Sequence, residues 1–223
     1  MDKQNFLTKI ADEELLREAF THRSYLNESK EKIPSNERLE FLGDAVLEIL
    51  VSEYLFRRFP EYPEGKLTLL RSSIVRTETL AKAAHTQSLG KYLRMSRGEE
   101  EHGGRTNESI LANTYEAVIG ALYLDQGLAV VKLFLESTLF PYFEEIITNK
   151  SYRDAKSHLQ EVVQEKHKIT PIYKVLKEEG PDHLKRFTVG VFVGDKQIGE
   201  GGGKNKQAAE SKAAEEALKN LEV

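Results

Sequence analysis

Residues 36–59 read NERLEFLGDAVLEILVSEYLFRRF, and this stretch decides the fold of the first part of the chain. It predicts one long helix, because its apolar side chains recur at helical spacing. The apolar positions are Leu39, Leu42, Val46, Ile49 and Leu50. Pro60 and Pro63 follow directly and end the helix, since proline cannot continue one.

Three carboxylates share one face of this helix. Glu37, Glu40 and Asp44 stand at positions i, i+3 and i+7, within about 60° of one another around the axis. A solvated acidic face is the ordinary interpretation, and Glu48, further along, is assigned to it. Glu40 and Asp44, however, lie in the most apolar helix of this part, where unpaired carboxylates are costly. The alternative is a site for a hard cation, which prefers oxygen ligands.

A second predicted helix, over 107–124, offers a matching polar pair. Asn113 and Glu116 stand at i and i+3, and Gly120 follows on the same face. Glycine costs about 1 kcal/mol inside a helix, so Gly43 and Gly120 indicate places where another helix comes close.

The rest of the first part also predicts helices and no useful strand alternation. Further helices are expected over 12–20, 66–84, 86–92 and 128–147, with a charged, glycine-bearing loop over 97–105. This part is therefore all-α. A short polar joint, residues 148–153, ends it.

Beyond the joint the pattern changes to α-β-β-β-α. A helix is expected over 154–167, strands over 172–176, 186–193 and 196–200, and an alanine-rich helix over 205–221. Gly194 and Asp195 form the turn between the last two strands. The result is a small sheet covered on one face by two helices.

Charge and composition narrow the functional classes. The chain carries 30% charged residues, a net charge of −4 and no cysteine, so disulfides and thiolate metal sites are excluded. From Ser151 onward there are 13 Lys and Arg against 12 Asp and Glu, and before it 19 against 24. We therefore expect an acidic functional site in the first part and a nucleic-acid-binding surface in the second.

Met1 to Ala11 is polar, and no stretch reaches the roughly 20 apolar residues of a membrane span. We therefore expect a cytoplasmic protein with no membrane partner.

Three motifs resemble the ribonuclease III family. Asn36–Leu47 (NERLEFLGDAVL) resembles its signature helix, Leu111–Ala121 (LANTYEAVIGA) its second acidic motif, and Thr21–Tyr25 (THRSY) its N-terminal motif. The resemblance covers nearly the whole chain and is to the short bacterial form. It implies a helical endonuclease domain over 1–147, a linker over 148–153 and a double-stranded RNA-binding domain over 154–223.

What the resemblance implies is a magnesium-dependent endoribonuclease that cuts double-stranded RNA. Its products carry 5′-phosphate and 3′-hydroxyl ends with short 3′ overhangs, and its substrates are ribosomal and other structured precursors. Mg²⁺, for which Mn²⁺ can substitute, would be held by Glu40, Asp44, Glu116 and the position of Asn113. Asp44 and Glu116 carry catalysis, with Glu37 and Glu64 in supporting roles. The family is homodimeric and needs no small-molecule organic cofactor. Phe41 resembles its dimer-contact aromatic, and core packing is the alternative for that residue.

Asn113 departs from the family pattern, which has aspartate there. Asparagine keeps one carbonyl oxygen but loses a negative charge, so metal affinity should fall. A catalytically impaired dimer that binds double-stranded RNA is therefore the alternative function. An acidic hydrolase for small phosphates would leave the second domain unexplained.

The second domain resembles the double-stranded RNA-binding domain, which reads shape and 2′-hydroxyls across two minor grooves. On the first helix Gln160 and Glu161 are expected to be exposed and to contact a minor groove. His183, in the loop after Gly180, is the second expected contact. The run Gly199–Ala209 (GEGGGKNKQAA) is interpreted as a glycine-rich approach to phosphate at a helix N-terminus. The phosphate clamp would be Lys204, Asn205, Lys206 and Gln207. Each assignment has a non-functional alternative. Gln160 and Glu161 could lie on an ordinary polar helix face, and His183 could be a solvated loop histidine. The run Gly199–Ala209 could be a plain helix start.

Overall fold

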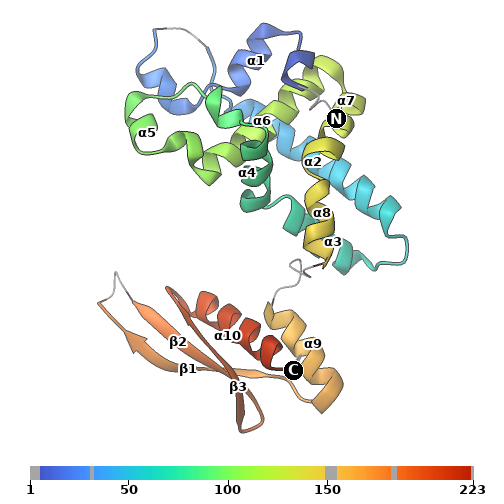
Figure 1. Ribbon diagram of the computed structural model, residues 1–223, viewed down its shortest axis with the longest axis vertical. Coiled ribbons are helices and arrows are strands. Elements are labelled where there is room, and N and C mark those ends of the chain that lie inside the picture. Colours follow the sequence, from blue (N-terminus) through green and yellow to red (C-terminus); the bar gives the residue numbers. More distant parts are fainter. Residues whose placement is uncertain (1–5, 31–32, 149–154, 182–184, 222–223) are drawn as a thin grey trace. The chain divides into compact units, whose positions relative to one another are not determined.

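The structure, a computed structural model, describes residues 6–30, 33–148, 155–181 and 185–221 (Figure 1). By their contacts, the residues fall into two compact units, 1–152 and 153–223, and each is described by itself. The predicted joint at 148–153 lies outside the described residues except for Thr148, which ends a helix.

The first unit is helical, as predicted. Its α-helices are α1 (Glu13–Ala19), α2 (Glu37–Arg58), α3 (Glu64–Ile74), α4 (Thr77–Thr86), α5 (Arg97–Glu101), α6 (Glu108–Gln126), α7 (Leu128–Thr138) and α8 (Pro141–Thr148). Short 3-10 helices lie at Phe6–Lys9, Arg23–Asn27, Leu89–Lys91 and Gly104–Thr106. Helix α6 runs through the middle of this unit, with α2 and α4 packed against it (Figure 1).

Helices α2 and α6 cross with their backbones in contact, at the two glycines that the sequence singled out. A Cβ built on Gly43 would lie 1.8 Å from the carbonyl oxygen of Glu116, and one on Gly120 would lie 2.3 Å from that of Leu39. Around the crossing the side chains of Leu47, Tyr115 and Ile119 are fully buried. The crossing therefore fixes the two acidic helix faces side by side.

Several predicted elements have different bounds. The helix expected over 66–84 is two, because Arg76 adopts an extended backbone (φ −67°, ψ 152°) and begins a new helix. The helix expected over 128–147 is also two. Its second half starts at Pro141, at the first helical position, where the missing N–H costs nothing. Of the short helix expected over 86–92, only Leu89–Lys91 forms, as a 3-10 turn.

The segment 97–105, expected as a loop, contains α5 and a 3-10 turn. The Ser96 side chain accepts a hydrogen bond from the Glu99 backbone N–H at 3.2 Å, so α5 has a conventional N-cap. Gly103 (φ +82°) then ends the short helix.

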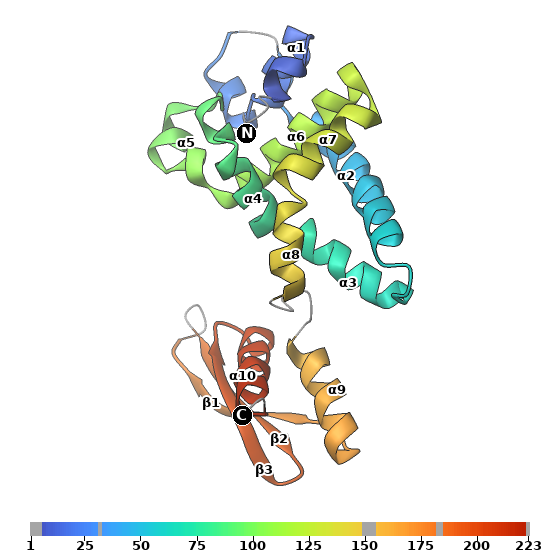
Figure 2. The ribbon, with the colours of Figure 1, turned by 45° about the vertical axis from the view of Figure 1, so that its right-hand side comes forward.

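The second unit has the predicted α-β-β-β-α order. It consists of α9 (Ala155–His167), β1 (Ile172–Glu179), β2 (Arg186–Val193), β3 (Lys196–Gly203) and α10 (Lys206–Leu221). The strands form an antiparallel sheet in the order β1-β2-β3, and Gly194 (φ +61°) makes the turn between the last two. Both helices cover the same face of this sheet (Figure 2), enclosing a core around Leu159, Val163 and Val191.

The interpretation of the glycine run as a loop that approaches phosphate is wrong. Gly199, Gly201 and Gly203 belong to β3, and a Cβ on any of them would lie within 2.5 Å of the α10 backbone. These glycines let the helix backbone, with its alanines Ala209, Ala213 and Ala217, pack directly on the strand. Their role is therefore in packing.

Candidate functional site

The two acidic helix faces meet beside the α2–α6 crossing. Burial raises the pKa of Glu40, the charge of Glu37 raises it further, a hydrogen bond from the Asn113 side chain lowers it, and the charge of Asp44 raises it. Glu40, from α2, is thus in contact with Asn113, from α6, and in the electrostatic field of the other two carboxylates. The site is formed from both helices.

Glu116 is the most perturbed carboxyl of this cluster. Burial raises its pKa to about 8, with further upward contributions from the charges of Asp44 and then Glu40. Glu116 therefore keeps its proton at neutral pH in the absence of a cation. Such a shift, caused first by burial and then by neighbouring carboxylates, marks a candidate functional site, and a bound divalent cation would favour the charged form of Glu116.

The donor set fits a hard divalent cation in chemistry, with the carboxylates of Glu40, Asp44 and Glu116 and the amide oxygen of Asn113. The set is not already closed around a central point. Among the described residues, no three His, Cys, Asp or Glu side chains are spaced as a metal-binding group. Rotation of the side chains would have to bring the oxygens together around an ion.

Glu37 lies at the edge of the cluster. Its carboxylate accepts a hydrogen bond from the Ser35 hydroxyl at 2.9 Å and lies 3.6 Å from the guanidinium of Arg23. Glu37 is exposed, and its charge reaches Glu40. This position suits a supporting role beside the site.

Glu64 is not among the groups that perturb Glu40 or Glu116 within one chain. It begins α3, where it accepts a hydrogen bond from the Thr68 hydroxyl at 2.9 Å. There it lines a groove of about 490 Å³ together with Ile49, Phe56 and Leu67. Within one chain, Glu64 is therefore not part of the cluster formed by Glu40, Asp44 and Glu116.

Large apolar side chains line the outer face of α2 instead of the core. Phe41 is 80% exposed, Phe56 72% and Ile49 60%, so core packing is excluded for Phe41. Exposed apolar stripes of this kind mark interaction surfaces. This stripe, Phe41–Ile49–Phe56, runs along the helix that carries Glu40 and Asp44.

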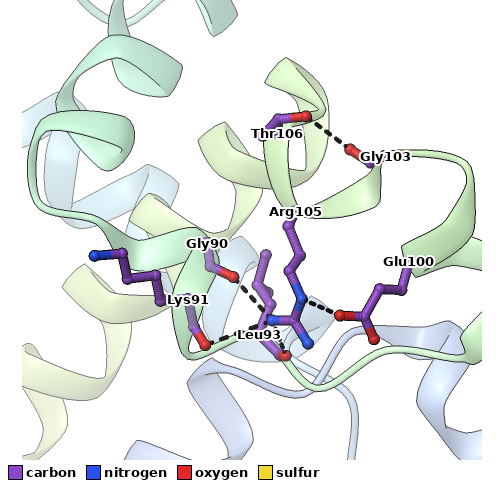
Figure 3. Close-up of polar contacts among 7 residues, drawn as sticks. All are labelled: Gly90, Lys91, Leu93, Glu100, Gly103, Arg105 and Thr106. Atoms are coloured by element: carbon purple, nitrogen blue, oxygen red, sulfur yellow. Dashed lines mark hydrogen bonds and ion pairs between the residues drawn. The ribbon is translucent and has the colours of Figure 1, made fainter.

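Arg105 is a positioning residue that no sequence motif indicated. Its Nη1 donates to the carbonyl oxygens of Leu93 (2.8 Å), Gly90 (3.0 Å) and Lys91 (3.5 Å), and its Nε pairs with Glu100 at 2.6 Å (Figure 3). The network ties the residues just before α6 to the segment 90–93. It fixes the start of the helix that carries Asn113 and Glu116.

The N-terminal motif, residues 21–25, forms a second network of hydrogen bonds. Nδ1 of His22 is hydrogen-bonded to the Ser24 hydroxyl at 2.8 Å, and the Ser24 oxygen accepts from the Ser96 N–H at 3.0 Å. Burial is the main cause that lowers the pKa of His22, so the ring is neutral at pH 7. The motif therefore holds the segment that precedes α2 against the backbone at Ser96.

The predicted RNA contacts of the second unit are described in part. Gln160 is exposed on α9, and Lys204, Lys206 and Gln207 are exposed at the start of α10. Asn205 is exposed too, and its Oδ1 accepts from the Ala208 N–H at 2.8 Å, which makes it the N-cap. His183 and the side chain of Glu161 lie outside the described residues.

In the described ranges 6–30, 33–148, 155–181 and 185–221, no helix has the combination of length and apolarity that crossing a bilayer requires.

Two family models match the chain, one for each unit. A ribonuclease-III-like model matches residues 12–143, and a double-stranded RNA binding motif matches residues 155–221. The matched ranges contain the acidic cluster and the start of α10, respectively.

Curated relatives and a solved structure agree with these matches. The chain is 46% identical to a ribonuclease 3 of Enterococcus faecalis over 98% of this chain and 95% of the relative. It is 48% identical to one of Lactococcus lactis subsp. lactis, with 97% and 94% covered. The nuclease domain of a Campylobacter jejuni ribonuclease III matches with a TM-score of 0.56 and 38% identity, covering 62% of this chain and 96% of that one.

Proposed function

This chain belongs to the ribonuclease III family of double-strand-specific endoribonucleases, and we propose that it cuts RNA with Mg²⁺ held between α2 and α6. The ligands are Glu40, Asp44, Glu116 and the amide oxygen of Asn113. The observation that supports the assignment is the buried carboxyl cluster: burial first, and then the charges of Asp44 and Glu40, raise the pKa of Glu116 to about 8. Its substrates are the family's, ribosomal and other structured RNA precursors, and the cytoplasm is its place of action.

When bound, Mg²⁺ or Mn²⁺ lowers the pKa of an attacking water and stabilises charge on the leaving oxygen. Ionised Glu116 and Asp44 orient that water and accept its proton. Glu37, at the edge of the cluster, contacts RNA or water. The water oxygen would bond to phosphorus as the bond from phosphorus to the 3′ oxygen breaks, and the 3′ oxygen would take up a proton from solvent, which gives 5′-phosphate and 3′-hydroxyl ends.

A homodimer completes the assembly in this proposal. The exposed stripe Phe41–Ile49–Phe56 and the adjoining groove would supply the apolar surface that a symmetric dimer buries. The C. jejuni nuclease domain has a region involved in dimer formation. Glu64, which lines the groove, would then approach the acidic cluster of the partner copy.

In this proposal, the second unit binds the RNA duplex. Gln160 and Glu161 on α9 would contact one minor groove and His183 the next, with Lys204, Asn205, Lys206 and Gln207 against the phosphates between them. The two lysines stand at the N-terminus of a 16-residue helix, where the dipole also favours phosphate.

Asn113 favours a second candidate function, an RNA-binding dimer with weakened cutting. Incubation of end-labelled duplex RNA with Mg²⁺ distinguishes the two. Shortened products with 5′-phosphate ends support the nuclease. An intact but retarded duplex at every Mg²⁺ concentration supports the binder, and an unbound, intact duplex contradicts both.

A further inference from the structure

A cavity of about 580 Å³ opens in the second unit between α9, the beginning of β1 and the first turns of α10. Its size lies within the range of small-molecule sites. Amide groups line it through Gln160, Asn205 and Gln207, and hydroxyl groups through Ser157 and Ser211. Pro171 and Tyr173 supply apolar surface.

The cavity is polar but carries little net charge. Among the lining residues whose side chains the structure describes, Lys156 is charged; its amino group pairs with Glu210 at 2.5 Å and lies 4.9 Å from the centre of the Tyr173 ring. Because Glu210 compensates this cation, the lining is better matched to an uncharged polar group than to a phosphate. Asn205 uses its oxygen to cap α10, so its amide nitrogen is the part that offers donors to a ligand.

The location of the cavity indicates where such a group comes from. Gln160 forms part of its wall on α9, and Asn205 and Gln207 form part of it at the start of α10. In the proposed function, which this inference builds on, these two places face the same RNA. The cavity therefore opens between a minor-groove contact and the phosphate contacts.

We propose that the cavity accepts a single unpaired nucleobase of a bound RNA. A base has flat apolar faces, which match the half-buried Tyr173, and an edge of hydrogen-bond donors and acceptors, which matches the amides. A base inside a regular duplex would first have to be unpaired and unstacked, whereas a bulged base would not. The cavity thus makes the protein prefer duplexes that carry a bulge at a defined place.

Binding of the full chain to two duplexes, in EDTA so that no cutting occurs, tests the proposal. The duplexes have the same sequence of about 20 base pairs, and one carries a single bulged adenine that is moved stepwise along it. At one position we expect binding about tenfold tighter than to the paired duplex. There the protein should also protect the adenine from dimethyl sulfate. Equal affinities at every position, with the adenine still reactive, would overturn the proposal.

Two substitutions at Ser211 give a matched pair. Ser211→Leu fills the cavity, whereas Ser211→Ala leaves it open, and both residues suit a helix. We expect S211A to keep the preference for the bulged duplex and S211L to lose it while binding the paired duplex like the unmodified chain. An S211L protein that retains the preference would contradict the proposal. If S211L misfolds, the dimethyl sulfate protection of the unmodified chain decides.

The outcomes also separate this inference from the function on which it rests. If the unmodified chain binds the paired duplex but shows no bulge preference, only the cavity proposal fails. If it binds neither duplex, the proposed RNA grip fails and the cavity proposal fails with it.

Discussion

At the scale of single residues, the proposed ion site places carboxyl groups where a negative charge is costly. Glu40 and Glu116 are partly buried, and their pKa values are raised by burial and by their carboxylate neighbours. A protein that tolerates such a cluster stores repulsion that a divalent cation would relieve. Because position 113 is asparagine and not the family's aspartate, this cluster has one negative charge fewer. The Asn113 side chain donates a hydrogen bond to Glu40.

Asn113→Asp should increase the affinity for Mg²⁺, because a carboxylate replaces an amide among the proposed ligands. We expect the Mg²⁺ concentration for half-maximal cleavage of duplex RNA to fall roughly tenfold. Asn107→Asp is a matched control, because it adds the same charge to α6 at its N-cap, where aspartate caps equally well. If N113D and the unmodified chain respond alike to Mg²⁺, Asn113 is not part of the ion site.

Without divalent cations, stability should fall as pH rises from about 5 to 8. The folded-state pKa of Glu116 is about 8 and its ordinary value 4.5, so the folded protein holds a proton that the unfolded chain has lost. This contribution is complete below the unfolded value and disappears as pH rises through the folded one. Urea unfolding in EDTA should show Glu116→Gln gaining on the order of 2 kcal/mol, relative to the unmodified chain, between pH 5 and pH 8. A constant difference between the two proteins would show that Glu116 ionises normally.

Sequence spacing was sufficient to predict which residues of α2 and α6 share a face, because helical geometry is local. Arg105 could not be predicted in this way. Its partners are backbone carbonyls of Gly90, Lys91 and Leu93, and a backbone carbonyl leaves no trace in the sequence. The cavity beside Tyr173 depends in the same way on how α9, β1 and α10 pack.

At the scale of elements, Gly43 and Gly120 set the distance between the two ligand-bearing helices. Their sequence positions predicted close packing, and the crossing confirms it. The helix break at Arg76 was not predicted, because tertiary packing ends the helix where no local signal is strong. The break before Pro141 does have a local signal, since proline favours the first helical position, and the helix expected over 128–147 did not take it into account. The glycines of β3 were misinterpreted for a related reason: a run of glycines suits both a phosphate loop and a strand under a helix.

Gly43→Ala should force α2 away from α6, because the new methyl group would meet the carbonyl of Glu116 at 1.8 Å. We expect a loss of about 3 kcal/mol in unfolding free energy and weaker Mg²⁺ binding. Gly65→Ala is the control, since nothing lies within 4 Å of its Cβ and alanine favours a helix, so a gain of up to about 1 kcal/mol is expected. If G43A is as stable as G65A, the helices are not held by this contact.

At the scale of the whole molecule, the charged groups and the exposed apolar side chains are distributed between the two units according to the functions proposed for them. The first unit carries the acidic cluster and the exposed stripe on α2, and the second carries the basic start of α10. The α-β-β-β-α order and the helical first unit were both predictable, because the period of the apolar pattern changes between them. The stripe was recognised at Phe41 alone, since Ile49 reads equally well as a core position.

Phe41→Ala should weaken self-association without destabilising the fold, because this side chain is 80% exposed in the single chain. A buried aromatic at an interface is worth about 2 kcal/mol or more, so we expect a dimer dissociation constant raised about thirtyfold in sedimentation equilibrium. Leu133→Ala, at an exposed position on α7, is the control and should leave association unchanged. Equal effects of the two substitutions would remove the α2 stripe from the dimer interface.

Calorimetric titration of Mg²⁺ at pH 7, in buffers of different ionisation enthalpy, tests the ion site between α2 and α6 most directly. Glu116, with a pKa of about 8, must give up its proton to become a ligand. The unmodified chain should therefore release nearly one proton for each ion bound, and Glu116→Gln should bind more weakly and release almost none. Mg²⁺ binding that is equally tight in E116Q, with the same proton release, would contradict the site.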